Sequence, residues 1–339
     1  MTPTPAPWEC AYGENAWQTP ARLVHVATDD PLALGRFALL EGSTPSYNNL
    51  IDVDRQLQTI THVAAAFDRA GGPVPSIAVG TKHGNACGAA VADSPITATE
   101  KMLTGDTRAI FGGCVMLGFE VDGPVAETLV GYATDSRRLL DLVSAAAFTD
   151  DALEVLARKH GKCRVLANPA LASLGVGSLD AAPRTRPVRG GALEQPNYTF
   201  VLDLAAPEVE RFGSLSAAQE RDLLLAWAIG STSNSNTITL VRDGQLLGNG
   251  VGQQDRVGGC ALAIMRARDA GHDTASAVAY SDSFFPFPDG AQTLVDAGIT
   301  AIFSTSGSVR DDAVRAAVAD AGVALVQLPD RAARGFFGH

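Results

Sequence analysis

Residues 291–327 read AQTLVDAGITAIFSTSGSVRDDAVRAAVADAGVALVQ, and their pattern indicates the fold class. They predict a helix, a strand, a second helix and a second strand in turn. The predicted elements are Ala291–Ala297, Ala301–Phe303, Asp311–Ala321 and Ala324–Gln327. Strands that alternate with helices form a sheet whose faces the helices cover, so this stretch predicts an α/β fold.

The same alternation extends toward the N-terminus. Ser216 is a good helix N-cap, and Gln219 three residues later completes a capping box for a helix over Ala217–Ile229. A strand over Asn236–Val241 and a helix over Cys260–Ala270 follow. These elements continue the α/β rhythm of the second half of the chain.

The first half shows a similar order. Apolar residues recur at helical spacing over Ile51–Ala70, and the Gly71-Gly72-Pro73 sequence ends this predicted helix. Short apolar runs predict buried strands at Ser76–Val79, Val115–Phe119 and Cys163–Leu166.

A basic stretch rich in Pro and Gly separates these two halves. It covers Ala181–Gly191 and reads AAPRTRPVRGG, which is typical of a boundary or a long surface loop. We therefore predict two α/β halves, residues 1–185 and 186–339. A Lys-His motif lies in the first, and Asn, GxGQQxR and SDxFFPF motifs lie in the second.

Composition narrows the functional class. The 339 residues are 46% hydrophobic and 19% charged, which indicates a globular chain, and the net charge of −11 argues against a nucleic-acid binder. The five Cys are scattered without a CxxC pair, which favours a reduced cytosol and disfavours structural zinc. The Pro-rich lead lacks signal-peptide features, and no apolar run reaches ~18 residues. We expect a soluble, cytoplasmic protein.

Two polar clusters interrupt the pattern where chemistry is expected. Lys82–Gly88 follows a buried strand, and an adjacent Lys and His are able to stabilise an oxyanion and move a proton. Such a pair is also typical of a solvated turn. Ser231–Asn236 is either a cap and turn cluster or the support of an amide aimed at a substrate carbonyl.

Two further clusters lie downstream. The glycines of Gly248–Arg256 permit either close backbone approach to a ligand or a flexible turn, and their spacing is not the GxGxxG of dinucleotide binding. Ser281–Asp289 holds three Phe and two Pro. It forms either a buried corner or a flat apolar wall for a planar ring, with Asp289 as a polar contact.

These clusters, in this order, resemble the AICAR (aminoimidazole carboxamide ribonucleotide) transformylase domain of the bifunctional purine-synthesis enzyme. The resemblance covers roughly residues 11–339. The matching motifs are Tyr12–Asn15 with Gln18, Ser46–Asp52, Lys82–Gly88, Phe111–Gly113, Gly190–Gln195, Ser235–Asn236, Gly250–Arg256, Ser281–Phe287, Ser306–Asp311 and Arg334–His339.

The resemblance implies a fold and an assembly. It implies two similar three-layer α/β/α halves that resemble a duplicated cytidine-deaminase fold. Sites in this family are built across a dimer, so a homodimer is expected. The family's N-terminal IMP cyclohydrolase domain has no counterpart in this sequence, so ring closure is not expected here and a separate cyclohydrolase is a possible partner.

The resemblance also implies roles in formyl transfer from 10-formyltetrahydrofolate to the AICAR amine. His83 takes the amine proton, Lys82 and Asn236 stabilise the oxyanion and place the donor, and Asp289, the fourth catalytic residue, binds the folate pterin or shuttles a proton near its N10. The expected folate-site residues are Asn236, Phe284, Phe287 and Asp289, and the expected nucleotide-site residues are Tyr12, Asn49, Gly112, Arg256, Phe284 and Arg334.

No metal is expected. A zinc site at His83 and Cys87 would need the CxxC and HxE partners of zinc deaminases, which the sequence lacks.

Two departures from the family leave alternatives open. Ala11 replaces an Arg that helps to hold the nucleotide phosphate, and Asn234 replaces a Lys found in many members. One alternative is therefore a formyltransferase of specialised metabolism that acts on a related amino-azole carboxamide. Others are an inactive nucleotide- or folate-binding protein and a structural partner of a separate cyclohydrolase.

Overall fold

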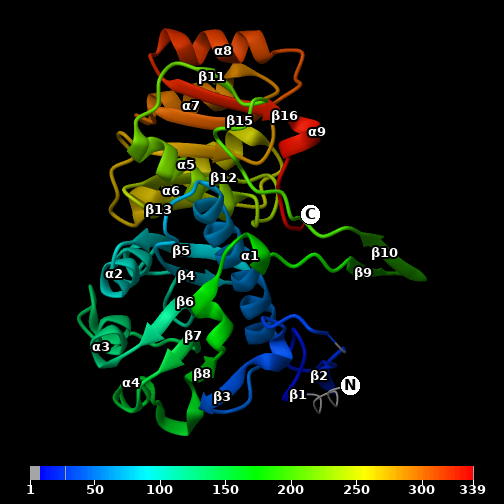
Figure 1. Cartoon of the computed structure of the whole chain (residues 1–339), viewed down its shortest axis with the longest axis vertical. Coiled ribbons are helices and arrows are strands. Elements are labelled where there is room, and N and C mark those ends of the chain that lie inside the picture. The colour runs from blue at the N-terminus through cyan, green and yellow to red at the C-terminus, as the bar shows by residue number, and fades with distance from the viewer. Residues whose placement is uncertain (1–7, 27, 339) are drawn as a thin grey trace.

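The computed structural model describes residues 8–26 and 28–338. In this part of the chain, one mixed sheet of 12 strands runs through the length of the molecule, with helices packed against it (Figure 1). The predicted α/β class is confirmed. The Pro-rich residues 1–7 and His339 of the last motif lie outside the described residues.

Each half contributes six strands in the same order. From the middle of the sheet outward, the first half runs β5-β4-β6-β7-β8-β3 and the second runs β13-β12-β14-β15-β16-β11. The strands are β3 (Ala38–Glu41), β4 (Ser76–Lys82), β5 (Asn85–Ala92), β6 (Cys114–Val121), β7 (Leu142–Phe148), β8 (Arg164–Ala167), β11 (Glu210–Phe212), β12 (Ile238–Arg242), β13 (Gln245–Gly250), β14 (Val278–Ser281), β15 (Ala301–Ser306) and β16 (Ala324–Pro329).

Strand directions repeat as well. In each half an antiparallel hairpin is followed by a third antiparallel strand, two parallel neighbours and an antiparallel edge strand. This repeat agrees with two similar halves. The halves join where Gln245 of β13 pairs with Ala90 of β5. The likeness to a deaminase fold and the division at residue 185 stay predictions.

Helices cover the sheet unequally on its two faces. One continuous core lies under α1 and α5, and it includes Ile60 and Trp227 from these helices and Val79 and Phe303 from the two halves of the sheet. Two separate cores lie under the remaining long helices on the opposite face. The helices are α1 (Tyr47–Arg69), α2 (Pro95–Gly105), α3 (Gly123–Gly131), α4 (Asp150–Leu156), α5 (Ala217–Gly230), α6 (Arg256–Asp269), α7 (Pro288–Asp296), α8 (Asp311–Asp320) and the short α9 (Asp330–Ala333).

Capping residues set the starts of the two helices of the shared core. The predicted capping box of Ser216 and Gln219 is present at the start of α5. Helix α1 begins at Tyr47, four residues before the predicted start, because Ser46 and Asn49 form a second capping box.

The polar cluster Lys82–Gly88, which we expected to form a turn after the strand, is a turn only in part. Only His83 and Gly84 form the turn, and Asn85–Ala92 is strand β5. The sequence NACGAAVA is rich in Ala and Gly, which are poor strand formers, so its pattern is weak. Pairing with β4 on one side and β13 on the other makes it a strand.

Two small hairpins lie outside the main sheet. Strands β1 (Trp8–Cys10) and β2 (Ala21–Leu23) pair near the N-terminus. Strands β9 (Arg184–Val188) and β10 (Gly191–Gln195) form an exposed hairpin that projects from the body (Figure 1). The polar stretch predicted as a boundary or loop is therefore largely this hairpin.

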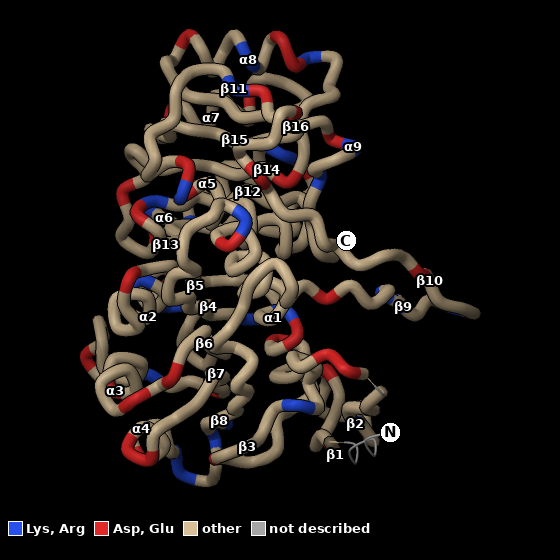
Figure 2. Tube along the Cα trace, viewed as in Figure 1, with Lys and Arg blue, Asp and Glu red and all other residues tan. Residues whose placement is uncertain are grey.

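Charged residues of both signs are interspersed along the trace (Figure 2). No helix in residues 8–26 and 28–338 has the length and apolar character needed to cross a membrane.

Candidate active site

The turn between β4 and β5 carries the predicted Lys-His pair. Lys82 ends β4 and pairs with Asn85, so the loop consists of His83 and Gly84 alone. Both have positive φ, 53° and 75°, as a type I′ hairpin turn requires. The exposed side chain of His83 therefore stands at the tip of a tight turn.

Lys82 is half-buried beside Gly112. Its Nζ donates a hydrogen bond to the Phe111 carbonyl at 2.7 Å, and a side chain at Gly112 would begin 3.9 Å from the same nitrogen. Gly112 has a φ of 69°, a conformation that favours glycine. The structure thus brings Gly112 next to the Lys82–His83 pair.

A buried carboxylate on α1 holds this turn. Asp52 Oδ1 accepts a hydrogen bond from the Gly84 N–H at 2.7 Å, and Oδ2 accepts one from the Cys114 thiol at 3.6 Å. Burial raises the pKa of Asp52, while these two hydrogen bonds lower it. The carboxylate fixes the backbone directly after His83.

A cavity of about 250 Å³ opens beside the turn. Its lining includes Lys82, His83, Asn85, Cys87 and Arg266. Burial raises the pKa of the Cys87 thiol to about 12, so this thiol stays protonated at neutral pH and is a poor nucleophile. The other ionisable side chains of the lining are His83, Lys82, Arg266 and Asp106, and the Asp106 carboxylate lies 3.9 Å from the Arg266 guanidinium.

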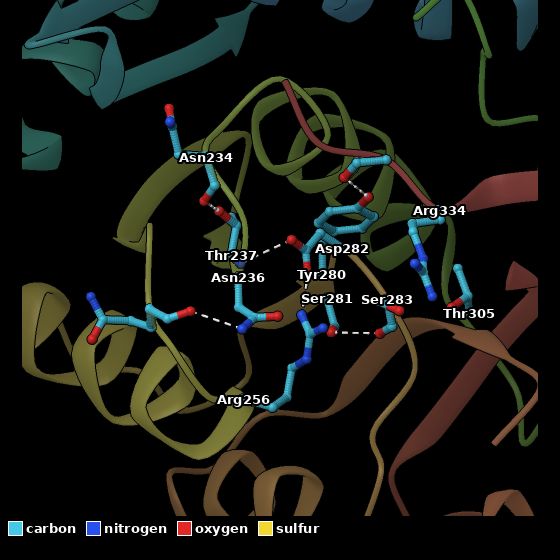
Figure 3. Close-up of polar contacts among 12 residues, drawn as sticks. Asn234, Asn236, Thr237, Arg256, Tyr280, Ser281, Asp282, Ser283, Thr305 and Arg334 are labelled. Atoms are coloured by element: carbon cyan, nitrogen blue, oxygen red, sulfur yellow. Dashed lines mark hydrogen bonds and ion pairs between the residues drawn. The ribbon is translucent and has the colours of Figure 1, made fainter. Parts of the chain in front are cut away.

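A second cavity, of about 470 Å³, collects four other predicted site residues. Asn236, Arg256, Phe284 and Arg334 all line it. Figure 3 shows Asn236 and Arg256 converging from two segments, with Arg334 on the other side. Polar and aromatic groups therefore meet at a site distinct from the Lys82 cavity within one chain.

Arg256 forms an ion pair with Asp282 in the second cavity (Figure 3). The side chain of Asp282 is fully buried, and its Oδ2 accepts a hydrogen bond from the Thr237 N–H at 3.1 Å. Within the described chain, Nε of Arg256 is buried without a hydrogen-bond partner. A buried carboxylate needs such a cation, so Arg256 has a structural partner in addition to its predicted ligand.

Asn236 is held by Gln253. The side-chain Nδ2 of Asn236 donates to the Gln253 carbonyl at 2.8 Å, and the two backbones exchange hydrogen bonds at 3.1 and 3.2 Å. This pairing fixes the amide at the edge of the second cavity. The sequence predicted that Asn236 begins a strand. Asn236 instead precedes β12, because Ile238 is the first residue that pairs with the neighbouring strands.

Arg334 lies across the same cavity in the C-terminal segment. It forms an ion pair with Asp330 at 2.6 Å, and its guanidinium carbon lies 6.0 Å from the centre of the Phe284 ring. Burial opposes ionisation of Asp330, but hydrogen bonds from Thr305, Arg334 and Ser283 outweigh it and lower the pKa of this carboxyl. The cation is therefore oriented by a carboxylate that stays ionised.

Four predicted residues lie apart from these two cavities. Asp289 is exposed in the first turn of α7, where its carboxylate accepts the Gly290 N–H at 2.8 Å. Phe287 is 53% exposed and Tyr12 is 40% exposed. Asn49 is buried in the α1 capping box. Their roles stay predictions.

Sequence reasoning missed Arg55 of α1. Its guanidinium donates to the carbonyls of Gly84 and Thr232, both at 2.9 Å, to the Phe337 carbonyl and to Asn234 Oδ1 at 3.0 Å. Nothing in the helical pattern separates Arg55 from a solvated arginine. A cation thus stands beside Asn234, the position where many family members have a lysine.

The glycines of the third polar cluster contact a helix. An added Cβ would lie 2.2 Å from the Ala263 carbonyl at Gly248 and 2.2 Å from the Gly259 carbonyl at Gly250. Both lie in β13 directly beneath α6, so the flexible turn is wrong for these two glycines. Gly248 also lines the Lys82 cavity, and close approach of a ligand stays a prediction. Only Gly252, with a φ of 67°, lies in an open turn.

In the second cluster, Ser231, Thr232 and Ser233 are buried. Thr232 and Ser233 bond back to carbonyls of the last turn of α5, which is the expected capping role.

In the described part of the chain, no three His, Cys, Asp or Glu side chains gather as metal ligands do.

Comparison with known proteins supports the resemblance. A family model described as AICARFT/IMPCHase bienzyme matches residues 6–266. The bifunctional purine biosynthesis protein PurH of Synechococcus sp. is 35% identical over 317 residues, which are 93% of this chain and 56% of that protein. The PurH proteins of Roseobacter denitrificans and Neisseria meningitidis are 33% identical, again over 93% of this chain and 57% and 56% of theirs.

The chain spans about half the length of the curated relatives it matches. The family match covers most of the chain, including the Lys82–His83 turn and the Asn236 loop. This chain therefore belongs to the AICARFT/IMPCHase bienzyme family.

Proposed function

We propose that this chain is a formyltransferase that moves the formyl group of 10-formyltetrahydrofolate to the amine of AICAR in purine synthesis. The observation that carries the proposal is the tight turn that exposes His83 beside Lys82 and Gly112 at a cavity. Membership in the family and the purine-synthesis names of the relatives support it. Those names give no support to an acceptor of specialised metabolism.

The reaction requires the groups that this turn presents. The AICAR amine is a weak nucleophile because its lone pair is delocalised into the imidazole and carboxamide. Attack on the formyl carbon therefore needs removal of an amine proton and stabilisation of a tetrahedral oxyanion. His83 takes the proton, assisted by the substrate carboxamide, and the Lys82 ammonium stabilises the oxyanion. When the intermediate collapses, the bond between the formyl carbon and N10 breaks, and N10 receives a proton as tetrahydrofolate leaves.

The second cavity supplies binding groups. Asn236 offers an amide to the formyl oxygen, and Phe284 offers an aromatic face to a planar ring. Arg334 and Arg256 are cations suited to the nucleotide, although each already contacts a carboxylate. Asp289 and Phe287 at α7 complete the proposed folate contacts.

The two groups of residues occupy separate cavities of one chain, which favours a homodimer. In a symmetric pair, the Lys82–His83 turn of one copy would face the Asn236 cavity of the other. The pair would complete two equivalent sites. Ring closure to IMP is not part of the proposal.

A spectroscopic formyl-transfer assay tests the function directly. We expect turnover of AICAR with 10-formyltetrahydrofolate. A folded protein that formylates neither AICAR nor its dephosphorylated nucleoside would contradict the proposal. Comparison of the ratio of the two KM values between the wild type and Ala11→Arg measures the effect of Ala11, which lies in the exposed N-terminal segment.

A further inference from the structure

Two residues of α1 hold Gly84 from both sides. The carboxylate of Asp52 accepts the Gly84 N–H at 2.7 Å, and Nε of Arg55 donates to the Gly84 carbonyl at 2.9 Å. These residues are three apart and therefore lie on the same face of the helix. The peptide groups that follow His83 are thus fixed by a rigid element.

The rest of the Arg55 guanidinium reaches two other segments. Its Nη2 donates to the Thr232 carbonyl at 2.9 Å and to Asn234 Oδ1 at 3.0 Å, and its Nη1 donates to the Phe337 carbonyl. The guanidinium carbon also lies 4.3 Å from the centre of the Phe337 ring. One side chain therefore joins three segments that are far apart in sequence.

Each joined segment carries a residue of the proposed active site. Gly84 follows His83, Asn234 is two residues before Asn236, and Phe337 is three residues after Arg334. All four acceptors of Arg55 are neutral oxygens, and three are backbone carbonyls. These hydrogen bonds fix backbone positions and do not neutralise a particular carboxylate.

Two further hydrogen bonds connect the same segments as Arg55 does. The Asn234 N–H donates to Asn85 Oδ1 at 3.3 Å, so the loop before β12 also touches the first residue of β5. One turn further along α1, the hydroxyls of Thr59 and Thr232 lie 2.8 Å apart.

Burial lowers the pKa of Arg55 to about 10, so the group remains a cation at neutral pH.

We propose that Arg55 is a positioning residue for the reaction: it fixes the His83–Gly84 turn, which serves one site of the proposed dimer, relative to the 232–236 loop and the C-terminal segment, which serve the other site. The inference rests on the proposed formyl transfer, but the geometry it describes exists without substrate. Arg55 is not among the residues that line either cavity. It acts through the backbone of the residues that do.

The test replaces Arg55 with lysine. Arg55→Lys keeps the charge, but a single ammonium group cannot span the acceptors that the guanidinium fork reaches. We expect kcat to fall by at least ~10-fold, because small displacements of reacting groups are costly, while KM for AICAR changes less than ~3-fold. Asn234→Ala, which removes one acceptor, should give a smaller loss of kcat.

Arg242→Lys is the matched control. The Arg242 guanidinium also donates to two carbonyls, those of Asp273 and Ala275, at the end of β12 remote from Asn236. It should lower the melting temperature to a similar extent and leave kcat unchanged. A folded Arg55→Lys with wild-type kcat would overturn the inference, as would an equal loss of kcat in Arg242→Lys.

Amide hydrogen exchange separates this inference from the proposed function. Exchange at Gly84 and Asn234 should accelerate in Arg55→Lys and stay unchanged in Arg242→Lys. If the wild type transfers no formyl group, the function is wrong, and the exchange experiment still tests the positioning. Unchanged exchange at both amides would refute it.

Discussion

His83 occupies a position where a histidine is tolerated and an alanine is strained. Its φ of 53° lies in the left-handed region, which Asn, Asp and His enter more readily than other side chains. Asn-Gly is also the preferred sequence of a type I′ turn. The residue therefore combines a turn requirement with the proposed role of general base.

We predict that His83→Ala and His83→Asn both lower kcat by ~10²-fold or more, as expected when a general base is removed. His83→Asn should keep the wild-type melting temperature because it suits the turn, so it is the better probe of chemistry. Steady-state kinetics and thermal unfolding check both statements. Near-normal kcat in either folded variant would rule out His83 as the base.

A second histidine affects stability instead. His62 of α1 is 1% exposed and stacks on Tyr198 with a ring distance of 5.4 Å. Burial lowers its pKa to about 4, although the hydrogen bond with the Gln58 carbonyl opposes this shift. The folded protein therefore resists protonation of this ring.

The sign of the pH effect follows from this shift. Between pH ~6.5 and 4, the unfolded chain binds a proton at His62 that the folded chain does not, so the free energy of unfolding falls as the pH falls. The loss reaches ~3 kcal/mol at ~1.4 kcal/mol per pKa unit. Urea unfolding from pH 7.5 to 5 should show about 2 kcal/mol of this loss, and His62→Phe should flatten the dependence. An unchanged slope in that variant would assign the acid sensitivity to other groups.

Sequence alone predicted part of the proposed site, and the limit has a physical cause. Lys82 and Asn236 lie in polar clusters that a short window identifies, whereas Arg334 was a candidate only through the resemblance to the family. Arg55 and the Arg256–Asp282 pairing depend on contacts between segments far apart in the chain. No local pattern encodes such a contact.

At the scale of secondary-structure elements, α6 packs closely on β13 because two residues of the strand are glycines without a side chain. Gly248 and Gly250 let the helix backbone approach the strand, and an added methyl group would meet a carbonyl at 2.2 Å in each case. The spacing of these glycines in the sequence resembled that of a ligand-binding turn. The helix that requires them, α6, begins only at Arg256, so the local sequence does not show the contact.

We predict that Gly250→Ala destabilises the protein by about 1–3 kcal/mol, since neither backbone can move away easily. Thermal unfolding measures this. Gly72→Ala is the control, because no atom lies within 4 Å of its added Cβ. Equal melting temperatures for the two variants would mean that α6 shifts freely on β13.

Much of the fold was predictable where local and tertiary preferences agree. The capping box of α5 and the run Ala301–Phe303 were recognised because cap chemistry and apolar strands are local signals. Strand β5 was missed because its Ala-rich sequence depends on its two neighbours for its conformation. Prediction from local sequence fails where pairing with neighbouring strands, and not the strand propensity of the residues, sets the conformation.

At the scale of the whole molecule, the two cavities of one chain suggest that each active site needs two copies. A mixture of His83→Asn and Asn236→Ala proteins tests this. If the turn and the loop of one site come from different copies, random exchange restores about a quarter of the wild-type activity. Light scattering should show a dimer for each variant and for the mixture. No recovery after verified exchange would place all the groups of one site in a single chain.

The exposed β9–β10 hairpin has a further consequence for how the chain can be made. Its tip lies between Val188 and Gly191, outside the core. Helix α1 precedes the hairpin in the sequence and α5 follows it, and the two helices pack together in one core. Residues 1–189 and 190–339 should therefore reassemble when they are expressed as two separate polypeptides, as insertions and breaks at exposed tips are usually tolerated. Co-purification of the pieces with formyl-transfer activity would turn the molecule into a split reporter, and failure to associate would show that the covalent link is essential for folding.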